Sequence, residues 1–185
     1  MNCPLPTWAE LGRQGWLHRG QKRPPFAIEP LAGQESVWDY PRPPRLVSDQ
    51  REVVVCAFGV EIARTQAAVR VLETSHPPTF YLPRRDVQMS YLVAAGGGSR
   101  CEWKGEASYF DIVVGERRIA RPAWSYEEPF DDATSIAGHL AFYASEVDAT
   151  VAGERVLSQP GGFYGGWITS ELVGPFKGEP GSGGW

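Results

Sequence analysis

Alternating apolar and polar positions in the middle of the chain predict a series of β-strands. The clearest alternation covers residues 107–114, after which Gly115 and Glu116 turn the chain and residues 118–124 return it. Because successive side chains of a strand point to opposite faces, this period of two predicts a hairpin. One face carries Phe110, Ile112 and Val114, and the other carries Ala107, Tyr109 and Asp111.

Shorter β-rich runs lie on both sides of this hairpin. Residues 53–58 and 60–63 flank Gly59 and predict a second hairpin. Further strands are expected over residues 69–74, 80–82, 139–143 and 147–151.

Helical signals are few. Asp86 is a suitable N-cap for a helix over residues 87–95, which Gly96, Gly97 and Gly98 are expected to end. A short helical turn is expected over residues 131–138. Many short strands with one or two short helices are typical of a mainly β domain, which we expect to be a single compact antiparallel sheet of barrel-like shape.

Two segments flank this β domain of residues 46–152. Residues 1–45 hold eight of the sixteen prolines, which predicts an extended or turn-like arm. Its apolar side chains, Trp38 and Tyr40 above all, predict that the arm packs on the domain. Residues 153–185 are rich in glycine but carry five large rings, which predicts a tail that packs across the sheet or onto a neighbouring subunit of a homo-oligomer.

Composition narrows the partners and the location. A net charge of −4 without any lysine-rich run disfavours nucleic acid and membrane surfaces as partners. The chain has neither an apolar run of about 20 residues nor a basic and apolar leader, so a cytoplasmic location is expected. Cys3, Cys56 and Cys101 are widely separated and form no Cys-x-x-Cys pair, which argues against disulfides and structural zinc. No metal and no cofactor are expected.

Chemically active side chains gather between Arg100 and Phe110. Lys104 stands among aromatic rings, where desolvation would depress its pKa and make it a nucleophile or proton carrier. The alternative is an ion pair with Glu73 or Glu106. Cys101 is either a buried filler or, if it is exposed beside Lys104, a reactive thiolate.

Two carboxylates and several rings complete the candidates. Glu73 is either a base or ligand acceptor facing Lys104, or an edge carboxylate paired with an arginine. Asp86 is either a catalytic acid or only the helix cap. The rings, which form either part of the core or a binding cage, are Tyr81, Trp103, Tyr109, Trp124 and Tyr126.

Between about Val53 and Gly153, a series of short motifs follows the same order as in the DUF427 proteins, a domain of unknown function. The chain therefore resembles this family. The flanking segments Trp38 to Pro44 and Gly161 to Lys177 resemble the extensions of an actinobacterial-type, hence bacterial, single-domain branch. The motifs are Val71 to Glu73, Pro77 and Pro78, Tyr81 to Pro83, Asp86 and Val87, Cys101, Lys104 and Gly105, Ala107, Tyr109, Ala123, Trp124, Tyr126, and Ala141 to Tyr143.

The resemblance implies a β-tent fold, similar to that of methionine sulfoxide reductase B domains. Those relatives bind zinc through paired Cys-x-x-Cys motifs, which this chain lacks. The family commonly reads Cys-Pro-Tyr-Lys-Gly, and here Glu102 and Trp103 occupy the middle, so a ring is retained. The family also carries a nucleotidyltransferase label. That activity would require close carboxylates to hold Mg²⁺ and a loop to hold the triphosphate. Neither Asp131 with Asp132 nor Gly96 to Ser99 matches these requirements.

Three functions are therefore open. The first is a module that binds a small metabolite or nucleotide-like molecule between rings, with Glu73 and Lys104 at its polar edge. The second is an enzyme of transferase or hydrolase type that uses Lys104 or Cys101 as nucleophile and Glu73 or Asp86 as base. The third is a structural or partner-binding protein that uses its ring-rich flanks. The first two require that folding bring Glu73 and Lys104 into one hollow.

Overall fold

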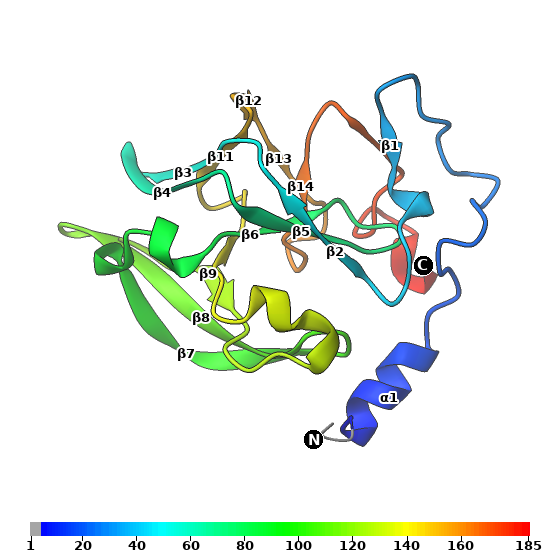
Figure 1. Cartoon of the computed structure of the whole chain (residues 1–185), viewed down its shortest axis with the longest axis horizontal. Coiled ribbons are helices and arrows are strands. Elements are labelled where there is room, and N and C mark those ends of the chain that lie inside the picture. The colour runs from blue at the N-terminus through cyan, green and yellow to red at the C-terminus, as the bar shows by residue number, and fades with distance from the viewer. Residues whose placement is uncertain (1–4) are drawn as a thin grey trace.

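The protein is mainly β, and the computed structural model describes residues 5–185. Three sheets make up the main body, and none of them closes into a barrel within the described residues. Figure 1 shows the long β7–β8–β9 sheet on one side and the β3–β4–β11 sheet on the other, with β5 and β6 between them.

The first sheet has the order β10 (Ala141–Phe142), β9 (Arg117–Ser125), β8 (Gly105–Val114) and β7 (Leu92–Cys101). The second has the order β12 (Glu154–Arg155), β11 (Asp148–Val151), β3 (Val53–Ala57) and β4 (Val60–Thr65). The third has the order β2 (Arg45–Asp49), β5 (Ala68–Leu72) and β6 (Thr79–Tyr81).

The flanking segments add two small strand pairs and short helices. β1 (Glu35–Ser36) pairs in parallel with β15 (Leu172–Val173), and β13 (Leu157–Ser158) pairs with β14 (Trp167–Ile168). The one α-helix of the described residues is α1 (Thr7–Gln14). The 3-10 turns are η1 (Val37–Asp39), η2 (Arg84–Asp86), η3 (Met89–Tyr91), η4 (Asp131–Ile136) and η5 (Ser182–Gly184).

The largest apolar core lies between the sheets and includes a residue of the C-terminal flank. Trp167 of β14 is fully buried, stacks on Phe80 at 5.2 Å between ring centroids, and donates a hydrogen bond from Nε1 to the Phe142 carbonyl. Burial of such a ring stabilises the fold by about 2 kcal/mol or more. The C-terminal flank is therefore part of the core.

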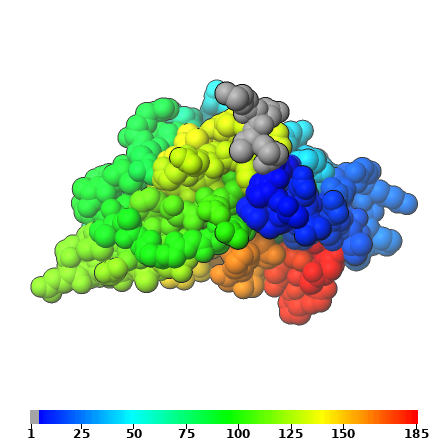
Figure 2. All heavy atoms as spheres, turned by 90° about the horizontal axis from the view of Figure 1, so that it is seen from below, coloured from blue at the N-terminus to red at the C-terminus, as the bar shows by residue number. Residues whose placement is uncertain are grey.

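The two flanks also meet each other around Trp38. The Trp38 ring is buried among Phe26, His18 and Trp185, and its Nε1 donates to the Pro175 carbonyl at 3.0 Å. Figure 2 shows the blue N-terminal residues lying against the red C-terminal residues and the green surface of β7 and β8. Trp38 thus joins both ends of the chain.

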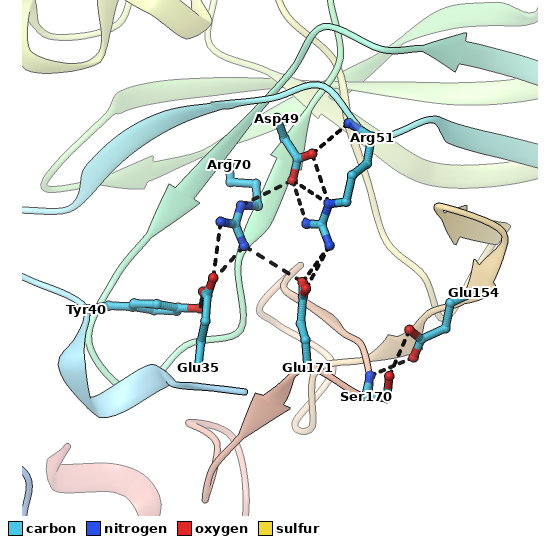
Figure 3. A network of polar contacts seen from close by, with 8 residues as sticks. All are labelled: Glu35, Tyr40, Asp49, Arg51, Arg70, Glu154, Ser170 and Glu171. Atoms are coloured by element: carbon cyan, nitrogen blue, oxygen red, sulfur yellow. Dashed lines mark hydrogen bonds and ion pairs between the residues drawn. The ribbon is translucent and has the colours of Figure 1, made fainter. Parts of the chain in front are cut away.

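A polar network fixes the same junction to the β domain (Figure 3). Arg51 contacts Asp49 at the end of β2 and Glu171 just before β15, at 2.6 and 2.8 Å. Arg70 of β5 lies 3.3 Å from Asp49 and 3.5 Å from Glu35 of β1. Since each arginine has two or more carboxylate partners, the C-terminal flank is held by a network instead of an isolated pair.

The prediction of a helix over residues 87–95 is wrong. The chain instead forms the 3-10 turn η3 and then strand β7, which pairs with β8 from Leu92 opposite Ile112 to Cys101 opposite Gly105. The glycines do not end a helix: they lie within β7, at a register shift between Ala95 and Gly98. An edge strand tolerates such a bulge, and pairing with β8 outweighs the weak helical pattern.

The expectation of an N-terminal arm without helix or sheet is also wrong. Pro6 precedes α1, at the end of a helix where a missing N–H costs nothing. Arg13 of this helix donates from Nε to the Glu102 carbonyl at 2.8 Å, and Trp8 contacts Phe130. The helix is therefore stabilised by the turn between β7 and β8 and by Phe130 just before η4, which a local pattern does not reveal.

Candidate functional site

A pocket of about 130 Å³ opens where β5, β6, β8 and β9 meet the two flanks. Strands β8 and β9 supply Tyr109 and Trp124, and β6 supplies Tyr81. Nine tryptophan, tyrosine and phenylalanine residues line the pocket: Trp16, Tyr81, Trp103, Tyr109, Trp124, Tyr126, Tyr143, Phe163 and Tyr164.

Hydrogen bonds and ring contacts hold this wall in place. Trp124 donates from Nε1 to the Tyr81 hydroxyl at 3.2 Å, and its ring lies 4.5 Å from that of Tyr143. The hydroxyls of Tyr109 and Ser99 lie 2.8 Å apart. Burial raises the pKa of Tyr81 to about 12, so its hydroxyl stays protonated at neutral pH. The rings therefore form a fixed, uncharged surface.

Glu73 follows β5 on the pocket wall and pairs with an arginine from the N-terminal flank. Its Oε1 accepts a hydrogen bond from Arg42 Nε at 3.0 Å. Arg42 also donates to the carbonyls of His18 and Thr74, both at 2.9 Å, and stacks on Trp16 at 3.9 Å. Burial raises the pKa of Glu73, but the charges of His76 when it is protonated in acid, of Lys104 and of Arg42 outweigh it, so the pKa lies below its ordinary value and Glu73 is a carboxylate.

His76 is held as a neutral ring with its proton on Nε2. The Gln159 amide is oriented because its Oε1 accepts from the Gly166 N–H and its Nε2 donates to the Lys177 carbonyl. That same Nε2 faces His76 Nδ1 at 2.9 Å, so Nδ1 is the acceptor. Burial lowers the pKa of His76 to about 4. Its Nε2 is buried without a hydrogen-bond partner.

Lys104 and Cys101 lie beside each other on the same wall. Burial lowers the pKa of Lys104, but Cys101, Tyr81 and Glu73 together raise it above its ordinary value. This is the opposite of the direction on which a lysine nucleophile depends. Neither predicted ion pair forms: Glu73 pairs with Arg42 and Glu106 pairs with Arg100.

The flanks complete the pocket. Trp16 is oriented by its Nε1, which donates to Glu102 Oε1 at 2.6 Å. On the other side, Phe163, Tyr164 and Gly165 approach from the C-terminal flank. A Cβ at Gly165 would overlap the Trp124 ring, so only glycine lets the chain pass this close. The wall therefore draws on segments from both ends of the chain.

The structure brings together most of the predicted site residues. Glu73, Cys101 and Lys104 line one pocket, together with all five predicted rings. Asp86 does not line it: η2 places Asp86 elsewhere, where its carboxylate accepts a hydrogen bond from Thr65 at 2.6 Å. It does not cap a helix over residues 87–95 either, because no helix forms there.

Sequence reasoning missed the residues whose role depends on distant contacts. Trp16, His76, Gln159 and Tyr164 line the pocket, and Arg42, which does not line it, pairs with Glu73. His76 and Gln159 stand 83 positions apart, and no local pattern links them. In the sequence, the signal that could have pointed to Trp16 and Tyr164 was the high aromatic content of both flanks.

Acidification should weaken the fold through His76. The unfolded chain protonates this histidine near pH 6.5, whereas the folded protein does so only near pH 4, so stability falls as pH drops between these values. His76→Asn should reduce the slope of unfolding free energy against pH by up to about 1.4 kcal/mol per unit. Urea denaturation at several values between pH 6.5 and 4.5 measures this, and equal slopes in both proteins would contradict the buried neutral ring.

Comparisons with known proteins give one family. Within residues 5–185, no three His, Cys, Asp or Glu side chains lie close enough together to hold a metal ion, and no helix is long and apolar enough to cross a membrane. No curated protein matches the chain. A family described as a domain of unknown function, DUF427, matches residues 45–153, which is more than half of the chain.

Proposed function

Since this chain belongs to the DUF427 family, whose function is unknown, we propose from its own geometry that it is a small-molecule binding domain. The observation that carries the proposal is one pocket lined by nine aromatic residues and by the polar groups of Glu73, His76 and Lys104. Largely apolar pockets with a few convergent polar groups are typical of small-molecule sites.

The size of the pocket limits the ligand. A volume of about 130 Å³ is close to the roughly 150 Å³ of a cavity that takes one benzene molecule. The pocket therefore has room for about one ring. The base of a nucleotide-like metabolite fits this limit only if the sugar and phosphates remain outside.

The chemistry of the wall favours binding over catalysis. A lysine with a raised pKa stays an ammonium and does not attack an electrophile. Nucleotidyl transfer needs carboxylates for Mg²⁺, and the two pocket carboxylates, Glu73 and Glu102, are already held by Arg42 and Trp16. Binding through the ring-rich flanks is less favoured as the main function, because Trp38 and Trp167 are buried inside this chain.

Cys101 offers a direct test because it lines the pocket, whereas Cys56 lies on β3 outside it. A library of single-ring fragments should contain compounds that slow alkylation of Cys101 by iodoacetamide. The rate at Cys56 should not change, since burial there is independent of the pocket. Peptide mass spectrometry reads both cysteines in one sample.

A matched variant shows whether the protection is specific. Trp124→Leu removes a ring from the wall and should weaken protection of Cys101 by about tenfold or more in fragment concentration, whereas Phe58→Leu, far from the pocket, should not. The proposal fails if no fragment protects Cys101 below about 1 mM, a weak affinity even for fragments of this size.

A further inference from the structure

The carboxylates on the pocket wall already have partners. Glu73 Oε1 accepts from Arg42 Nε at 3.0 Å, and Glu102 Oε1 accepts from Trp16 Nε1 at 2.6 Å. Each acid is engaged through one oxygen, and the ion pair with Arg42 disfavours Glu73 as the acceptor of a cationic ligand. A cation would also have to enter beside Lys104, which is on the same wall.

The Lys104 ammonium, by contrast, has no counter-ion in direct contact. Among residues 5–185, no carboxylate oxygen lies within 4.0 Å of it. Its nearest groups include the Cys101 thiol and the Tyr126 ring, whose centroid is 6.0 Å from Nζ. A partly buried charge without a contact partner gains most from an anion that enters the same space.

Two further donors on the same wall have no acceptor. Trp103 Nε1 and His76 Nε2 are buried and make no hydrogen bond among the described residues; Glu73 Oε1 lies 4.0 Å from His76 Nε2, which is too far for a hydrogen bond. Gln159 fixes the His76 proton on Nε2, so this nitrogen donates and does not accept. Buried donors are normally paired, and their lack of partners indicates that acceptor atoms come from elsewhere.

We propose that the pocket takes a planar single-ring monoanion, an aromatic or heteroaromatic carboxylate, with its acid group toward Lys104 and its ring among Tyr81, Trp124 and Tyr126. This inference rests on the proposed binding function and specifies its ligand class. The aromatic wall accounts for the ring, and the Lys104 ammonium together with the two donors that lack a partner accounts for the charge.

Benzoate, benzamide and benzylamine test the charge at nearly constant shape. Calorimetry at pH 7 should give an affinity for benzoate about tenfold or more above that for benzamide, with benzylamine weakest. Lys104→Met should remove this preference by weakening benzoate alone. Arg155→Met is the matched control, because Arg155 is an exposed cation paired with Asp148 that does not line the pocket, and it should leave the ratio of affinities unchanged.

The possible outcomes distinguish failure of the anionic ligand class from failure of the proposed small-molecule binding function. Equal affinities for benzoate and benzamide, or a preference for benzylamine, overturn the anionic class and leave a binding domain. The same holds if none of the three probes binds while other fragments protect Cys101. If no fragment protects Cys101, both proposals fall. The wild-type ratio needs no variant, so the test stands even if Lys104→Met does not fold.

Discussion

Arg42→Met is expected to lower the free energy of unfolding by about 3–5 kcal/mol at pH 7. The Arg42 side chain is fully buried and bonds Glu73 and the carbonyls of His18 and Thr74. Its removal leaves the Glu73 carboxylate, whose side chain is only 12% exposed, without its direct partner. Chemical denaturation of the two proteins measures the difference.

The pH dependence distinguishes an unpaired charge from lost packing. The Glu73 pKa is lowered from 4.5 in the folded protein, so its pairing contributes stability above that value and loses it as pH falls through the folded-state pKa. The cost of Arg42→Met should therefore shrink on acidification, and adding Glu73→Leu should recover part of it. Arg64→Met is the control, because Arg64 pairs with two carboxylates but its side chain is 48% exposed, and it should cost under about 1 kcal/mol. Equal costs at both arginines would contradict the buried pair.

Trp38→Ala is the second large effect, with an expected loss of about 3–5 kcal/mol. Trp38 is buried between the two flanks, where its ring meets Phe26 and Trp185 and its Nε1 bonds the Pro175 carbonyl. Truncation leaves a cavity and an unpaired carbonyl at the junction of the two ends. Urea denaturation measures the loss, and limited proteolysis should show faster cleavage within residues 15–35.

Phe163→Ala is the control for Trp38→Ala. Phe163 also belongs to a flank, but its side chain is 65% exposed, so its removal should change stability by no more than about 0.5 kcal/mol. A loss below about 1 kcal/mol for Trp38→Ala would mean that the flanks do not depend on each other in solution.

Local sequence pattern was enough for most strands and for the heart of the site. The period of two over residues 107–114 is present in β8, and the hairpin around Gly59 forms as expected. Pattern failed over residues 87–95, where a glycine-rich edge strand looks like a helix with a stop signal. It failed again at α1, whose stability comes from contacts with Glu102 and Phe130, more than 80 positions away.

The site shows the same division. Lys104 and Trp103 stood out because they are adjacent in an unusual motif, and Glu73 because a charge followed an apolar strand. Arg42, His76 and Gln159 became visible only in three dimensions, since each depends on partners that the topology supplies from another segment. The direction of the Lys104 pKa shift also depends on neighbouring groups, namely Cys101, Tyr81 and Glu73. Burial alone therefore predicted a lowered pKa, whereas the pKa is raised.

The C-terminal side of the pocket has a consequence for synthesis of the chain on the ribosome. Gln159, Tyr164 and Gly165 form one wall, and they are translated after Glu73, Lys104 and strands β2 to β11. A nascent chain that has emerged only as far as Gly153 therefore presents an open half-site. On the binding function proposed above, a ligand is enclosed only after residues 159–165 have left the exit tunnel, so its capture follows the synthesis of the whole β domain.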